Sequence, residues 1–203
     1  DKPLAATVAD LPWQAVSLDV LREKYAKGPE RELDGPEMAR AVRRRVARAL
    51  AELGVDFFST AFDLSSADFL EDIGVPAYKI ASGDLKSRPL LEHVARFGKP
   101  MIISTGGALI EDVQRAYDVI MPINPQLCLL QCTAGYPAAF EELNLRVITT
   151  FRERFPQLVA GLSSHDNGIA MALAAYMLGA RVVEKHFTLN HTWKGTDHAF
   201  SLE

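Results

Sequence analysis

Apolar and polar positions alternate in a regular way along most of the chain. Residues 36–54 carry apolar side chains at helical spacing and end on Gly54, which predicts a helix closed by a glycine. After it come six short apolar runs, each followed by a loop or an amphipathic stretch. The runs are VDFFST (55–60), AYKIASGD (77–84), PMIISTG (100–106), LCLLQCT (127–133), LVAGLSSHD (158–166) and RVVEKHF (181–187). The predicted helices between them lie at 65–74, 88–98, 109–121, 141–155 and 168–180.

Strands that alternate with helices predict a parallel α/β sheet, and two architectures compete, an open doubly wound sheet and a barrel. All six runs end in polar groups. An open sheet concentrates its ligand site at one switch point, whereas a barrel gathers residues from every strand end on one face. We therefore predict a TIM (β/α)8 barrel that is incomplete here. The six runs correspond to strands 3 to 8 of such a barrel, and the first two βα units are missing. Residues 1–203 are interpreted as one partial barrel domain, with 1–35 an irregular loop region and 36–203 a helix followed by six βα-type units.

Charge and cysteine content narrow the class of protein. The net charge of −4 is spread over interspersed acidic and basic residues, so we expect no nucleic-acid partner. The basic stretch RAVRRRVARAL (40–50) fits the solvated face of a helix better than a phosphate-binding patch. Cys128 and Cys132 are too few for a zinc site and behave as small apolar side chains, which favours a reducing, cytoplasmic location. No signal peptide or membrane-spanning run is evident, so no membrane partner is expected.

The last run places chemically active side chains on one face. Because side chains alternate along a strand, Glu184 and His186 share a face, and Lys185 points the other way, toward helices or solvent. His165 ends the preceding run. Two imidazoles on adjacent strand ends can reach one transition-metal ion, with a carboxylate nearby. Two core histidines satisfied by backbone groups are the alternative, and the residue pattern leaves both open.

Lys79 stands inside an apolar run, where an ammonium group is costly unless it is paired. A bound phosphate would pair it, helped by the hydroxyls of Ser82 and Ser104. A structural ion pair with Asp84 or Glu184 is the alternative. This lysine is therefore a candidate for either an anion site or a structural ion pair.

Seven motifs, in order between about Val55 and Glu203, resemble the sialic acid synthase (N-acetylneuraminate synthase) family. They are YKIASGD, ISTGG, QCTAGYP, NLRVI, GLSSHDNGIA, EKHFTLN and TWKGTDHAFSLE. The resemblance implies a (β/α)8 barrel followed by a small antifreeze-like domain that is absent from this sequence. It also implies a carbon–carbon bond-forming transferase that condenses phosphoenolpyruvate with N-acetylmannosamine or a related aldose. The products would be a nonulosonic acid and phosphate.

The same resemblance assigns roles to individual positions. A divalent metal, most often Mn²⁺ with Mg²⁺ or Co²⁺ as substitutes, would be held by His165 and His186. The implied substrate-binding residues are Thr60, Lys79, Ser82, Ser104, Ser163 and Asp197. The implied catalytic residues are Asp84, Tyr136 and Glu184, and the sequence does not decide whether Asp84 or Glu184 orients the attacking water. Ser164 stands where the family often has Asp, which weakens any acid role at that position.

Two rival functions stay open. The same chemistry could act on another sugar, of the legionaminic, pseudaminic or 6-phosphosugar type. An inactive barrel could instead serve as a binding or scaffold protein. The resemblance further leads us to expect a homodimer.

Overall fold

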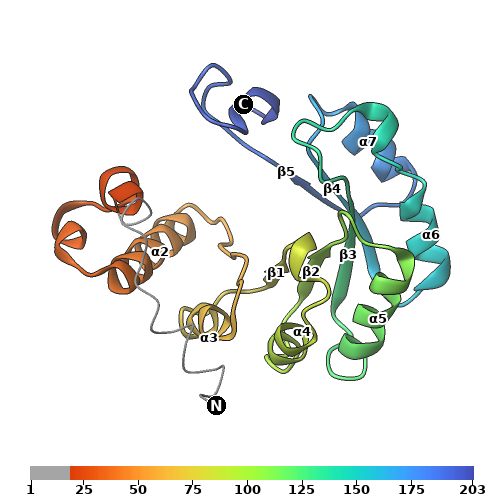
Figure 1. Cartoon of the computed structure of the whole chain (residues 1–203), viewed down its shortest axis with the longest axis horizontal. Coiled ribbons are helices and arrows are strands. Elements are labelled where there is room, and N and C mark those ends of the chain that lie inside the picture. The colour runs from red at the N-terminus through yellow and green to blue at the C-terminus, as the bar shows by residue number, and fades with distance from the viewer. Residues whose placement is uncertain (1–18) are drawn as a thin grey trace, which may run out of the picture. The chain divides into compact units, whose positions relative to one another are not determined.

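The computed structural model describes residues 19–203, so the first half of the predicted irregular region 1–35 lies outside the described residues. The chain divides into two compact units, one up to Phe57 and one from Phe58 to Glu203 (Figure 1). Each unit has its own secondary structure and is described by itself. No helix in the described part of the chain is both long and apolar enough to cross a membrane.

The first unit is built from short helical turns and one long helix. A π-helical turn η2 (Leu21–Tyr25) and a 3-10 turn η3 (Gly28–Glu32) precede helix α2 (Gly35–Glu52), which matches the helix predicted at 36–54. The helix starts where the Asp34 carboxylate accepts a hydrogen bond from the Glu37 amide at 2.9 Å. A small apolar centre is formed by Ala26, Met38 and Val42, against which Leu21, Leu33 and Val46 pack.

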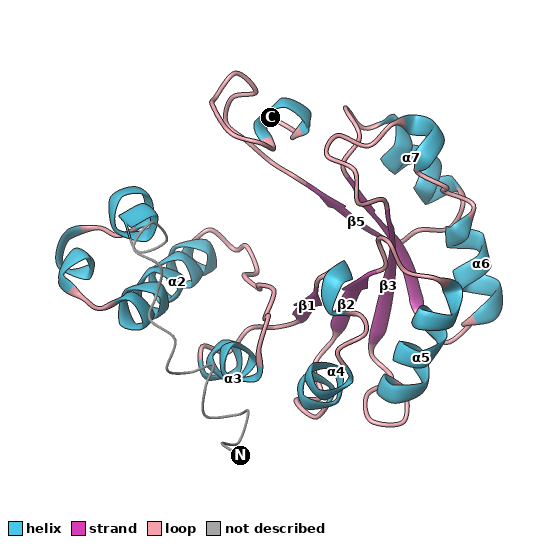
Figure 2. Ribbon diagram, in the orientation of Figure 1, coloured by secondary structure: helices cyan, strands magenta, loops and turns pink. Residues whose placement is uncertain are grey.

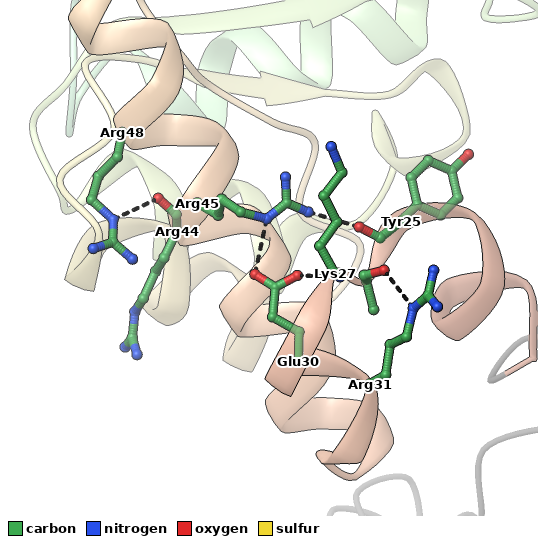
Figure 3. A network of polar contacts seen from close by, with 8 residues as sticks. Tyr25, Lys27, Glu30, Arg31, Arg44, Arg45 and Arg48 are labelled. Atoms are coloured by element: carbon green, nitrogen blue, oxygen red, sulfur yellow. Dashed lines mark hydrogen bonds and ion pairs between the residues drawn. The ribbon is translucent and has the colours of Figure 1, made fainter.

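A network of polar contacts ties the turns of this unit to α2 (Figure 3). One carboxylate oxygen of Glu30 accepts a hydrogen bond from Arg45 Nε at 2.9 Å, and the other accepts from the Lys27 amide at 2.9 Å. Arg45 also donates through Nη2 to the Tyr25 carbonyl at 2.7 Å. The Arg45 hydrogen bond, followed by the one from Lys27, lowers the pKa of Glu30. Of the arginine-rich stretch, Arg45 thus has a structural role, and Arg48 is exposed as predicted.

The second unit is a single parallel sheet with helices between successive strands (Figure 2). Its strands lie in sequence order: β1 (Tyr78–Ile80), β2 (Met101–Ser104), β3 (Leu127–Cys132), β4 (Val159–Ser164) and β5 (Val182–Lys185). Its helices are α3 (Leu64–Asp72), α4 (Arg88–Ala95), α5 (Ile110–Ile120), α6 (Val147–Arg154) and α7 (Ala170–Met177). Three 3-10 turns complete it: η4 (Ser82–Asp84), η5 (Phe140–Glu142) and η6 (His198–Phe200). The predicted alternation and the parallel sheet are therefore confirmed.

The first predicted strand, at 55–60, is wrong. In the described chain only Thr60 of that run pairs with the sheet, through an isolated parallel bridge to Lys79 of β1. A strand requires a ladder of successive hydrogen bonds, and β1 itself has only three residues to offer. Residues 19–203 thus form five strands where six were predicted, with Thr60 beside β1.

The sheet curls so that its two edge strands face each other across its inner side. Lys79 of β1 lies 3.6 Å from the Glu184 carboxylate of β5, although three strands separate β1 from β5 in the sheet. Helices α4 to α7 lie on the opposite, outer side (Figures 1 and 2). This curled parallel half-barrel agrees with the predicted incomplete barrel, and a closed ring of eight strands stays a prediction.

Close packing on the inner face of the sheet explains why residue 161 of β4 is a glycine. A Cβ at Gly161 of β4 would lie 2.5 Å from Leu130 Cδ2 of β3 and 2.5 Å from the Val182 carbonyl of β5. Any larger residue would push the neighbouring strands apart. Outside this face, buried Leu129 of β3 and Phe151 of α6 belong to the apolar core of the unit.

Candidate active site

The carboxyl ends of the five parallel strands meet along one edge of the sheet, and most of the predicted site residues lie there. Ser82 and Asp84 follow β1, Ser104 ends β2, and Tyr136 lies in the loop after β3. Ser163 pairs with Glu184 in the register of β4 and β5. His165 and His186 each come directly after the last residues of these strands, and Asp197 lies in the final loop.

A buried lysine is the hub of the inner face. Lys79 is only 9 % exposed, and its Nζ donates to Ser104 Oγ at 2.8 Å and to the Ile80 carbonyl at 3.1 Å. Its carboxylate neighbour is Glu184, at 3.6 Å, so of the two predicted ionic partners the structure has Glu184 and not Asp84. Ser163 Oγ donates to the other oxygen of Glu184 at 2.7 Å. A connected polar chain therefore runs from β2 through β1 and β5 to β4.

The two histidines lie together at the end of β4 and β5. Their ring centroids are 5.2 Å apart. His165 Nδ1 donates to the Thr133 carbonyl at 2.8 Å, which leaves Nε2 with a free lone pair. Burial lowers the pKa of His165, and nearby His186 acts in the same direction, so the imidazole is held in its neutral form.

An aromatic residue and a carboxylate flank the histidine pair. The Tyr136 ring lies 4.0 Å from the His165 ring and 6.2 Å from the His186 ring, measured between centroids. Partial burial raises the pKa of Tyr136, as do the neighbouring Cys132 and Asp197, so the phenol stays protonated. Asp197 lies 3.6 Å from His186 Nδ1 and brings a negative charge to the second imidazole.

Three predicted residues stand apart from this cluster. Ser82 Oγ accepts a hydrogen bond from the Gly106 amide at 2.9 Å, which links η4 to the loop after β2. Asp84 enters none of the side-chain hydrogen bonds or ion pairs found among residues 19–203. Thr60 is connected to the site through its isolated backbone bridge to Lys79.

Lys185 faces away from Glu184, as the alternation predicts, but it is not solvated. Its Nζ lies 3.0 Å from Asp166 Oδ1 and also donates to the Asp166 carbonyl, and the two side chains are 6 % and 1 % exposed. Ser164 Oγ also donates to Asp166 Oδ1. Asp166 is not among the residues predicted from the sequence, although a carboxylate at the end of a buried run needs a partner and is therefore a signal.

The histidine pair offers a small ligand set for a metal ion. No group of three or more His, Cys, Asp and Glu side chains within residues 19–203 is arranged to hold a metal. Imidazoles suit a first-row transition metal, and the backbone hydrogen bond at His165 Nδ1 is the usual way to orient a ligating ring. The chemistry of these two side chains thus fits a divalent transition-metal ion.

Residues 31–203 match the model of the NeuB family. The chain belongs to this family. It is 42 % identical over 160 residues to the human N-acetylneuraminate-9-phosphate synthase, covering 79 % of this chain and 45 % of that protein. It is 41 % identical over 152 residues to the N,N'-diacetyllegionaminic acid synthase of Campylobacter jejuni, covering 73 % of this chain and 45 % of that protein. The resemblance to sialic acid synthases is confirmed.

A solved NeuB-like structure agrees with the fold. The spore coat polysaccharide biosynthesis protein SpsE of Bacillus subtilis superposes with a TM-score of 0.79 at 36 % identity, covering 94 % of this chain and 53 % of that one. The chain therefore spans about half the length of the relatives it matches.

Proposed function

We propose that this NeuB-family chain carries the reaction centre of a synthase that condenses phosphoenolpyruvate with N-acetylmannosamine or a related aldose. The products are a nonulosonic acid and phosphate. The main support is the joint presence, at one sheet edge, of a buried ammonium for an anion and of two imidazoles whose ring centroids are 5.2 Å apart. The two relatives, an N-acetylneuraminate-9-phosphate synthase and an N,N'-diacetyllegionaminic acid synthase, support the reaction class.

Lys79 binds the anionic substrate in this proposal. Its ammonium is fixed by Ser104 and the Ile80 carbonyl, so a phosphate or carboxylate group would meet a charge that is already positioned. The Ser104 hydroxyl oxygen accepts from Lys79, so its own proton can be donated to the anion. Glu184 balances the charge of Lys79 before the anion arrives.

His165 and His186 would hold the divalent metal, most often Mn²⁺. When bound, the ion would polarise the aldehyde of the open-chain sugar as a Lewis acid. Tyr136 covers one side of the histidine pair with its ring and keeps its proton, so it can donate a hydrogen bond to a sugar oxygen. Asp197 would orient His186 through its Nδ1.

Glu184 is the better of the two candidates for orienting water. In the reaction, the methylene carbon of phosphoenolpyruvate bonds to the aldehyde carbon, and the aldehyde oxygen takes a proton. Water adds to the enol carbon and loses a proton, and the carbon–oxygen bond to phosphate then breaks. A carboxylate that acts on this water must be held in place. Glu184 is held from both sides by Ser163 and Lys79, whereas Asp84 has no such side-chain partner in the described chain.

The test uses the intact protein that contains this chain. Phosphoenolpyruvate and Mn²⁺ are supplied with N-acetylmannosamine, its 6-phosphate, or the hexose precursors of legionaminic and pseudaminic acid. Phosphate release is measured together with the mass of the product. We expect phosphate release that requires both substrates and stops on chelation, and the best acceptor identifies the sugar. Folded protein that forms no sugar acid with any of the four acceptors would overturn the proposal and favour a binding or scaffold role.

A further inference from the structure

The ion pair between Lys185 and Asp166 brackets the two candidate metal ligands. Asp166 directly follows His165, and Lys185 directly precedes His186. The Lys185 ammonium contacts both the carbonyl and the Oδ1 of Asp166, so it ties the chain just after β4 to the end of β5. Each residue of this ion pair is therefore the direct sequence neighbour of one of the two histidines.

The hydrogen bonds around this ion pair hold the Asp166 side chain in one position between β4 and β5. Ser164, the last residue of β4, donates to the same Oδ1 that faces Lys185. Ser164 and Lys185 are also direct partners in the strand register. Two residues from two strands thus converge on one carboxylate oxygen, which fixes the direction in which the chain leaves β4 at His165.

The same contacts are poorly arranged for stability. Both side chains are almost completely buried, and a buried ion pair gives little net stability over an apolar pair of similar size. Asp166 Oδ2 is moreover buried without a hydrogen-bond partner in the described chain, which is unfavourable. A pair that contributes little to stability and leaves an unsatisfied oxygen calls for another role.

We propose that Asp166 and Lys185 are positioning residues that set the separation and orientation of His165 and His186 for metal binding. This inference rests on the proposed function, because it takes the two histidines as the metal ligands. Neither Asp166 nor Lys185 is proposed as a metal ligand or as a substrate-binding residue. The ion pair acts through the backbone on either side of each histidine, in the way that outer residues orient ligands at other metal centres.

The experiment measures Mn²⁺ affinity by calorimetry on the intact protein. Lys185→Met keeps the length of the side chain and removes the tie, and it should weaken Mn²⁺ binding about 10–100-fold, as losses of outer partners do elsewhere. The matched control is Lys99→Met, which removes an ion pair with Glu71 near the start of β2 and should leave Mn²⁺ affinity unchanged. With saturating Co²⁺, the visible absorption of Lys185→Met should also differ from wild type, because the ligand geometry has changed.

The outcomes distinguish the proposed metal site at His165 and His186 from the positioning role of Asp166 and Lys185. If His186→Ala abolishes Mn²⁺ binding but Lys185→Met binds as wild type does, the positioning role is overturned and the metal site stands. If His186→Ala binds Mn²⁺ normally, the metal site and the positioning role fall together. Should Lys185→Met fail to fold, the isosteric Asp166→Asn gives the same measurement. It is expected to weaken Mn²⁺ binding severalfold, and wild-type affinity in that folded variant would also overturn the proposal.

Discussion

The two ends of the parallel sheet use polar residues in opposite ways. At the amino end, the Tyr78 hydroxyl and Lys99 both donate to the Glu71 carboxylate, at 2.6 and 2.7 Å. At the carboxyl end, Lys79 contacts three partners, and His165 Nε2 has no hydrogen-bond partner within residues 19–203. Tyr78 and Lys79 are neighbours in one strand, yet they serve these two different ends.

This difference follows from what each end needs. The Glu71 group is closed: the Tyr78 hydroxyl of β1 and the Lys99 ammonium in the loop before β2 both donate to the Glu71 carboxylate of α3. The carboxyl end keeps groups that can still bind something, such as the 57 % exposed Tyr136 and the carboxylate of Asp197. In parallel barrels the carboxyl end of the strands carries function and the amino end carries stability. Matched substitutions at the two ends can test whether the same division holds here.

The largest effect is expected for His186→Ala. It should abolish synthase activity and Mn²⁺ binding while leaving thermal unfolding close to wild type, because the side chain is partly exposed and packs mainly against other rings. Activity is measured as phosphate release after chelation and return of Mn²⁺. Unchanged activity in this variant would show that His186 is not part of the active site. The functional role assigned to the carboxyl end of the sheet would then lose its main residue.

The next effect is expected for Glu184→Gln, with Glu71→Gln as the same change at the other end. Glu184→Gln keeps the shape but removes the charge beside Lys79, and kcat should fall about 100-fold or more, as for other losses of acid–base groups. Glu71→Gln should leave kcat within about twofold. Equal losses in the two variants would mean that the two ends are not functionally distinct.

Lys79→Met, paired with Lys99→Met, should have a smaller effect. Loss of the buried ammonium should raise the KM for phosphoenolpyruvate about tenfold or more, because a charged hydrogen bond to the anion is removed. The KM for the sugar should change less, and Lys99→Met should change neither. An unaltered KM for phosphoenolpyruvate would show that Lys79 serves the ion pair with Glu184 only.

The sequence predicted the parts of the fold that depend on local pattern. The helices of the second unit and five of the six predicted strands follow from apolar periodicity. The opposite faces of β5 on which Glu184 and Lys185 lie follow from the alternation of side chains along a strand. Contacts between elements were not predictable in the same way. The run at 55–60 has the composition of a strand but finds a ladder partner only at Thr60 in the described chain. Lys185 could be assigned a face, but its burial depends on Asp166 lying across from it, which only the folded chain determines.

The smallest effect concerns stability and is expected for Glu71→Gln. Burial alone would raise the pKa of Glu71, but the hydrogen bonds from Lys99 and Tyr78 outweigh it and hold that pKa below its ordinary value of 4.5. Because the folded-state pKa is lower than the unfolded one, the charged carboxylate stabilises the fold above pH 4.5, and this contribution disappears as the pH falls through the folded-state pKa. The ion pair is partly exposed, so Glu71→Gln should lower Tm at pH 7 by about 2–4 °C at most. The difference from wild type should shrink steadily below pH 4.5 in a series of melts. A difference that grows in acid would show that the Glu71 carboxylate does not stabilise the amino end of the sheet through its charge.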